Sequence, residues 1–215
     1  MPNWTDNRFV IYGEKGQLIK FYMDMSLATS KNPNFITVDN SWDNLWVGNL
    51  FLGAGYTEAE LKDFQCRGGV DELTLEEDCV IIDDHTAWEP NEESMKRMLE
   101  EKYPGLQMVF KAVEPGADIW INTDTTGKFI PGRFAIDCWC SNDSFDSVTE
   151  DYEDVEDVLR ALSDISGRPI EEVRAVLGDK EIDCVDWGEW LRGVYNIPES
   201  EDCACYVHTY ENTYL

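Results

Sequence analysis

Basic residues are scarce in this chain of 215 residues, which carries 17 Lys and Arg against 44 Asp and Glu and has a formal net charge of −27. Affinity for nucleic acid comes from clustered cations that displace counterions from phosphates. The composition therefore excludes direct nucleic-acid binding as the main function. It also argues against a membrane partner, because an acidic surface is repelled by anionic lipid.

Motifs of catalysis are lacking as well. The chain has two histidines and contains no Ser or Cys nucleophile motif, no Gly-rich phosphate loop and no His-Glu-x-x-His motif. Asp83-Asp84-His85 is the one carboxylate–histidine cluster, and adjacent residues of a strand face opposite sides of a sheet. We expect a protein that is not an enzyme and uses no cofactor; a metal-dependent enzyme is the less favoured alternative.

Long apolar runs are also missing. The longest nearly apolar stretch, Trp46 to Tyr56, is too short and too rich in glycine to span a bilayer. The residues from Met1 to Arg8 show neither the basic nor the apolar region of a signal peptide. Without an export signal, the odd number of seven cysteines favours reduced thiols over a disulfide framework. The expected location is the cytoplasm.

Aromatic residues, by contrast, are plentiful: the chain has eight Trp, nine Tyr and nine Phe. Disordered chains of such high charge normally contain few aromatics, so we expect a folded protein with a real core. Charge and composition change after residue 140, because residues 1–140 hold 24 acidic and 12 basic residues whereas residues 141–215 hold 20 and 5. A Ser/Asn/Asp cluster, Ser141–Ser144, is typical of a connection. These features predict two regions, 1–140 and 141–215.

The first region is expected to be an α+β domain in which helices cover one face of an antiparallel sheet. Apolar periodicity and turn residues predict strands at Arg8–Gly13, Cys79–Ile82, Leu106–Val113, Asp118–Thr123 and Lys128–Asp137, helices at Gln17–Leu27 and Asn91–Tyr103, and an irregular insert at about 28–76.

The second region is expected to be an acidic, mostly helical extension. The capping-box pattern Ser147-Val148-Thr149-Glu150 predicts the start of a helix. Apolar residues follow it at helical spacing as far as Ile165. Two shorter helices are expected after Pro169 and after Asp186, and a final strand at Cys205–Tyr210.

Four sequence islands carry a family resemblance. They are Pro2-Asn3-Trp4 with Asn7, Thr86-Ala87-Trp88-Glu89-Pro90, Tyr103-Pro104-Gly105-Leu106 and Val113-Glu114-Pro115-Gly116. In this order they resemble the YubB-type ferredoxin-like domain of plasmid and phage proteins, over residues 1–137. Glu89 and Asn91 depart from the family, which usually has Ser and a second Pro around Trp88. The resemblance implies a ferredoxin-like fold and a phage or mobile-element origin, and it assigns no catalytic residues.

The acidic run is the candidate partner-binding site. It contains no Lys or Arg and consists of Asp143, Asp146, Glu150, Asp151, Glu153, Asp154, Glu156 and Asp157. If a helix starts at Glu150, then Glu150, Asp154 and Asp157 line one outward flank. Fifteen helical residues span roughly 22 Å, over which duplex DNA presents about 13 phosphates. We therefore expect a nucleic-acid-mimicking surface that occupies a basic groove of a host nucleic-acid-binding protein or complex, as an anti-CRISPR or anti-restriction inhibitor does.

Two alternatives stay open. A charge run is usually a solvated face that keeps a chain soluble, in which case the protein is a non-catalytic accessory or assembly protein. The pairs Cys138/Cys140 and Cys203/Cys205 would form a four-thiolate metal site if they met, but their spacing differs from the Cys-x-x-Cys typical of zinc sites. Buried free thiols are the favoured interpretation, and no metal site is predicted.

Overall fold

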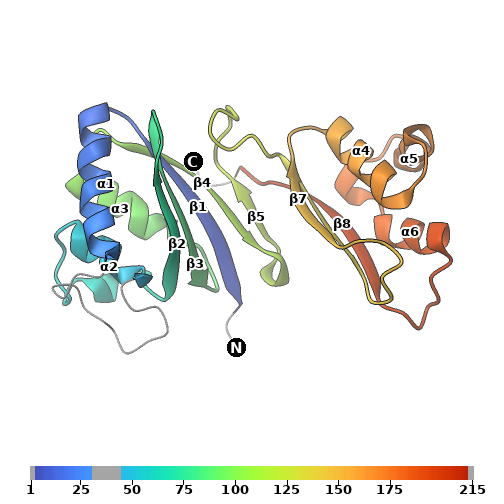
Figure 1. Cartoon of the computed structure of the whole chain (residues 1–215), viewed down its shortest axis with the longest axis horizontal. Helices are drawn as coiled ribbons and strands as arrows, with labels where there is room; N and C mark the ends of the chain where they lie inside the picture. Colours follow the sequence, from blue (N-terminus) through green and yellow to red (C-terminus); the bar gives the residue numbers. More distant parts are fainter. Residues whose placement is uncertain (1–2, 31–44, 213–215) are drawn as a thin grey trace. The chain divides into compact units, whose positions relative to one another are not determined.

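The computed structural model describes residues 3–30 and 45–212, so Pro2 and part of the predicted insert, residues 31–44, lie outside the described residues. The chain forms two compact units, residues 1–124 and 125–212 (Figure 1). The division differs from the predicted boundary after residue 140. In the described ranges, no helix is both long and apolar enough to cross a membrane.

The first unit contains a five-stranded sheet in which every pair of neighbours is antiparallel. Its strands are β1 (Trp4–Tyr12), β2 (Gly68–Leu75), β3 (Cys79–Ala87), β4 (Gln107–Glu114) and β5 (Ile119–Asn122), in the order β2-β3-β1-β4-β5. The central strand β1 places Phe9 opposite both Ile82 and Phe110. Because side chains alternate along a strand, Phe9 and Ile11 enter the core together.

Three helices pack on one face of this sheet, on the left in Figure 1. They are α1 (Lys15–Thr29), α2 (Gly48–Gly53) and α3 (Glu92–Lys102). The spacing of Phe21 and Met25 on α1, and of Met95 and Met98 on α3, directs these side chains into the core with Phe9. The α+β prediction for this unit is therefore confirmed, and so are both predicted helices.

Strand β2 lies within the segment that the sequence left as an irregular insert. Its first residue, Gly68, has no room for a side chain, because a Cβ atom there would lie 2.0 Å from the backbone oxygen of His85. A register shift between Val70 and Glu72 interrupts the ladder with β3. The glycine at its start and the bulge interrupt the alternation of apolar residues that would have indicated a strand in the sequence.

The second unit has a three-stranded antiparallel sheet in the order β7-β6-β8. The strands are β6 (Phe134–Cys140), β7 (Val148–Tyr152) and β8 (Cys203–Thr209), and the helices are α4 (Val155–Ser166), α5 (Ile170–Leu177) and α6 (Trp187–Tyr195). The three helices lie on one side of the sheet (Figure 1). Ile136, Leu162, Trp187 and Leu191 form the centre of their common core.

The structure corrects two expectations for this unit. The predicted strand Lys128–Asp137 does not close the first sheet, because its residues in β6 pair with β7 and β8. The capping-box segment Ser147–Glu150 does not start a helix. Instead, β7 begins at Val148, which pairs with Cys138 on β6. The helix starts at Val155, and the Asp154 carboxylate accepts a hydrogen bond from the Asp157 amide at 2.9 Å.

Candidate partner-binding site

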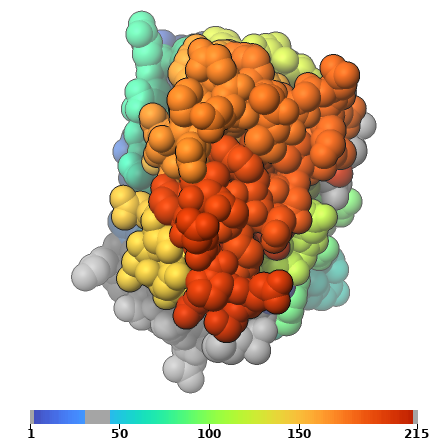
Figure 2. Space-filling model, turned by 90° about the vertical axis from the view of Figure 1, so that its right-hand side faces the viewer, coloured from blue at the N-terminus to red at the C-terminus, as the bar shows by residue number. Residues whose placement is uncertain are grey.

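A groove of about 550 Å³ lies between β7 and α4 in the second unit. It is lined by Val148, Glu150, Asp151, Tyr152, Glu153, Asp157, Arg160, Ala161, Asp164 and Ile165. Five of these residues are acidic, and Arg160 is the one base among them. Figure 2 shows the surface of the second unit, where α4 to α6 are the orange to red atoms.

Two periodicities build this groove. Val148, Glu150 and Tyr152 alternate along β7 and therefore share one face, the face that Ile136 and Cys138 of β6 turn toward the helices. On α4, Asp157 and Asp164 are separated by seven residues, which is two helical turns, so they lie on the same side of the helix. The carboxylates thus converge from a strand and a helix.

Four of the eight predicted acidic residues line this groove, Glu150, Asp151, Glu153 and Asp157, although the Asp151 side chain lies on the opposite face of β7 from that of Glu150. The predicted helical flank of Glu150, Asp154 and Asp157 is wrong, because the chain is a strand as far as Tyr152. Asp143 and Asp146 are exposed in the connection between β6 and β7. Asp164, which the sequence argument missed, could have been found from its seven-residue spacing to Asp157.

Several of the predicted carboxylates have partners within the unit. Asp157 pairs with Arg160 at 2.5 Å and Glu156 with Arg174 at 2.8 Å, while Asp154 caps α4. These ion pairs are largely exposed, so each contributes at most about 1 kcal/mol. Their more important effect is to neutralise part of the acidic run.

Two tyrosines hold the carboxylates of β7. The Tyr210 hydroxyl donates to Asp151 at 2.5 Å, and the Tyr152 hydroxyl donates to Glu150 at 3.2 Å. Burial, followed by the Glu150 charge, raises the pKa of Tyr152 to about 12, so this hydroxyl remains a donor at neutral pH. Glu150 is therefore a carboxylate whose position is fixed by the Tyr152 hydroxyl, and a carboxylate can accept more than one hydrogen bond.

Glu153 and Asp164 are the acidic residues of the groove with the fewest side-chain interactions. Within the described part of the chain, their side chains make no hydrogen bond or ion pair, and both are exposed. A carboxylate accepts charge-assisted hydrogen bonds from guanidinium and ammonium groups. The groove can therefore bind cationic side chains of a partner, and its lining residues include no nucleophile activated by a base.

The Asp83-Asp84-His85 cluster does not form a joint site. Asp83 accepts two hydrogen bonds from the Arg8 guanidinium, at 2.7 and 2.8 Å, and His85 contacts Asp71 at 2.9 Å. Asp84 lies on the opposite face of β3, where it is buried and accepts hydrogen bonds from other side chains. Burial raises the pKa of Asp84 to about 7.

The two Cys-x-Cys pairs do meet, which the sequence left open. Cys138 lies opposite Cys205, and Cys140 lies opposite Cys203, on neighbouring strands. Cys138 and Cys205 form a disulfide, so the expectation of reduced thiols is wrong for this pair. The five free cysteines are Cys66, Cys79, Cys140, Cys184 and Cys203. With two of the four sulfurs bonded to each other, the cluster is not a four-thiolate metal site in this structure.

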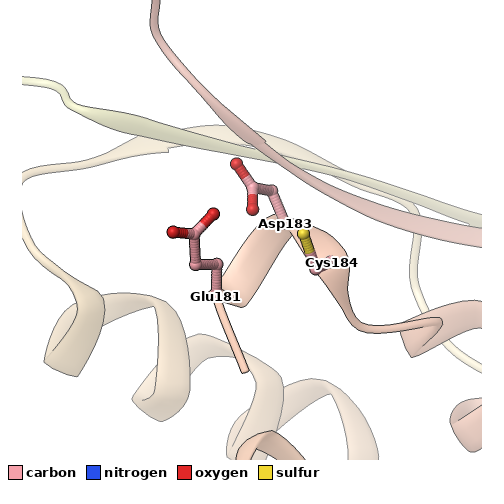
Figure 3. A group of neighbouring side chains, drawn as sticks. All are labelled: Glu181, Asp183 and Cys184. Carbon is pink, nitrogen blue, oxygen red and sulfur yellow. The ribbon is translucent and has the colours of Figure 1, made fainter. Parts of the chain in front are cut away.

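One exposed group of potential metal ligands lies elsewhere in the second unit (Figure 3). The ligand atoms of Glu181, Asp183 and Cys184 lie within 4.8 Å of one another. The Thr209 hydroxyl already donates to Asp183 at 2.6 Å. Desolvation, followed by the neighbouring Asp183 and Glu181 carboxylates, raises the pKa of the Cys184 thiol, so this cysteine is a protonated thiol at neutral pH.

Comparisons with protein families, curated proteins and solved structures find no match for this chain. Among the features above, the acidic groove between β7 and α4 combines an open cavity, positioned acceptors and a strong excess of one charge.

Proposed function

We propose that this protein is a non-catalytic inhibitor that binds a basic, nucleic-acid-binding surface of a host defence complex, of the anti-CRISPR or anti-restriction type. The observation that carries this proposal is a groove lined by five acidic residues and one basic residue, in a chain with a net charge of −27. A basic groove built for phosphates would attract such a surface over long range and bind it by charge-assisted hydrogen bonds. The proposed setting is the cytoplasm of the host cell.

The first unit supports a phage or mobile-element origin. Its helices and strands follow the order β1-α1-α2-β2-β3-α3-β4-β5, and the strands are arranged β2-β3-β1-β4-β5. Without α2 and β5, this order is compatible with the ferredoxin-like fold that the family resemblance implies. Two of the islands that resemble the YubB-type domain also touch. The Asn7 amide donates to the Thr86 hydroxyl at 2.9 Å, and the Trp88 amide donates to the Asn3 carbonyl at 2.8 Å.

A second candidate is an accessory or assembly protein whose acidity serves solubility alone. The capping hydrogen bond of Asp154 and the ion pairs of Glu156 and Asp157 favour this candidate, because they show that part of the acidic run stabilises the second unit itself. The two candidates differ in what the remaining groove carboxylates do. Only the inhibitor needs them for binding.

Charge reversal of the groove separates the candidates. In the variant Glu150→Lys/Glu153→Lys/Asp164→Lys, three groove carboxylates change sign while the cap Asp154 stays intact. The matched control Glu58→Lys/Glu77→Lys/Glu100→Lys makes the same charge change at exposed positions of the first unit. Binding to purified CRISPR effector complexes and restriction enzymes would be measured by interferometry at several salt concentrations.

We expect wild-type protein and the control to bind one of these targets with an affinity that falls as salt rises. The groove variant should bind about tenfold to a hundredfold more weakly, since three contacts of about 0.5–1 kcal/mol each are lost. Equal weakening in both variants would indicate a net-charge effect only. Unchanged binding by the groove variant would contradict the proposal.

A further inference from the structure

Two neighbouring pairs of cysteines form a ladder on the helix-covered face of the second sheet. Residues two apart on a strand share a face, so Cys138 and Cys140 of β6 lie on the same side of the sheet, and so do Cys203 and Cys205 of β8. The antiparallel register sets Cys138 opposite Cys205 and Cys140 opposite Cys203. The first pair is a disulfide whose Cα atoms lie 4.0 Å apart.

The second pair has free thiols on directly opposite residues of the two strands. The Cys140 thiol donates a hydrogen bond to the Asn142 side-chain oxygen at 2.9 Å. Cys140 is 6% exposed, whereas Cys203 is only partly buried. The pair therefore has a solvent-side sulfur and a protected sulfur, at the last paired position of the β6–β8 ladder.

We propose that Cys140 and Cys203 form a thiol–disulfide exchange site, which low-molecular-weight disulfides of the glutathione class oxidise to a second cross-strand bridge. The Cys203 thiolate attacks the incoming disulfide, forms a mixed disulfide and releases one thiolate. Cys140 then loses its proton to water and attacks the Cys203 sulfur, which expels the second thiolate. In total, two protein thiols and one external disulfide become one protein disulfide and two external thiols.

The surroundings of Cys203 set the rate of the first step. Burial, followed by Cys140, raises the pKa of the Cys203 thiol; from α6, Arg192 opposes this change and Glu189 adds to it. Little thiolate is present at neutral pH as a result. The rate of oxidation should therefore increase with pH above 7, while the position of the bridge stays the same.

The second bridge would affect reactivity more than stability. Once Cys138 and Cys205 are joined, linking Cys140 to Cys203 closes only a small ring across two residues of each strand, so little further chain entropy is removed. Backbone bonds already hold this end, where the Ser141 amide donates to the Asp202 carbonyl at 2.9 Å. We expect a change in melting temperature of only a few degrees between the two oxidation states.

The test uses the full chain equilibrated with oxidised and reduced glutathione over a range of ratios at pH 8. Free thiols are then alkylated in denaturant, and bridges are mapped by mass spectrometry of an unreduced digest. Five thiols per chain should fall to three, with Cys140 and Cys203 as the pair consumed. Cys184→Ser, which removes the exposed cysteine, should form the same bridge, and Cys203→Ser should form none.

Three results would overturn the proposal. One is a chain that keeps Cys140 and Cys203 reduced even under strongly oxidising ratios. Another is bridging of Cys140 or Cys203 to a different cysteine, or glutathione adducts without a bridge. The third is retention of one zinc ion per chain with all four ladder thiols protected, which would make the cluster a metal site. If Cys203→Ser does not fold, the disulfide bridges mapped in the wild-type protein are sufficient to distinguish these results.

Discussion

The carboxyl group of Asp84 allows the sharpest stability prediction. It is 1% exposed in the first unit and accepts hydrogen bonds from Asn7 at 2.8 Å and from Asn91 at 3.1 Å. The replacement Asp84→Asn removes the charge and keeps the shape. The new amide can be accommodated, because the side-chain oxygen of Asn91 has no hydrogen-bond partner among the described residues and can accept from it after a flip.

The size of the effect follows from the pKa of Asp84. Burial raises this pKa from 3.8 to about 7, although the bonds from Asn7 and Asn91 oppose the change. Because the folded state holds the proton more tightly, the stability contributed by this group is fully present below pH 4 and is lost as the pH rises through 7. At about 1.4 kcal/mol for each pH unit in this window, the loss is about 4 kcal/mol.

The assay compares the wild type with Asp84→Asn from pH 4 to pH 8 by hydrogen exchange of β1 and β3 amides, which lie beside Asp84. We expect the free energy of opening of the wild type to fall by about 4 kcal/mol relative to the variant across this range. If the free energy of opening changed with pH in the same way in the wild type and in Asp84→Asn, Asp84 would not titrate between pH 4 and pH 8, and the reasoning would be refuted.

Three further substitutions test the packing and capping of the two units. Asp154→Ala removes the cap of α4 and should lower the free energy of unfolding of the second unit by about 1 kcal/mol in urea melts, whereas Asp154→Asn should restore most of it. Trp187→Ala removes a fully buried side chain that donates to Ile182, and should cost about 3–5 kcal/mol by the same measurement. Gly68→Ala places a Cβ against the His85 backbone and should cost about 2 kcal/mol, seen as faster hydrogen exchange in β2 and β3.

Local patterns predicted the elements that carry their own periodicity. Helix α1 was found from Leu18, Phe21 and Met25, and these residues are indeed buried. The sequence did not predict β2, because Gly68 and Gly69 at its start resemble a turn and a bulge interrupts its alternation. Gly68 is required by the close approach of the His85 backbone, and this contact exists only in the assembled sheet.

For the candidate site, the sequence likewise indicated which residues are present but not how they are arranged. The acidic run was visible in the sequence, but its shape depended on whether residues 148–152 have a period of two or of 3.6 residues. The capping-box pattern favoured a helix, whereas pairing of Val148 and Tyr152 with β6 favoured a strand, and the tertiary contact prevailed. The disulfide depended in the same way on the register of β6 with β8, which no local pattern encodes.

The central claim is that the groove carboxylates occupy a surface meant for nucleic acid, and a competition measurement tests it most directly. A fluorescent DNA duplex is bound to a purified CRISPR effector complex or restriction enzyme, and the protein is titrated in at physiological salt while anisotropy is followed. We expect wild-type protein to displace the duplex, and Glu150→Lys/Glu153→Lys/Asp164→Lys to do so only at concentrations about tenfold to a hundredfold higher. Displacement that is equally strong with both proteins, or binding of the wild type beside an undisturbed duplex, would contradict it.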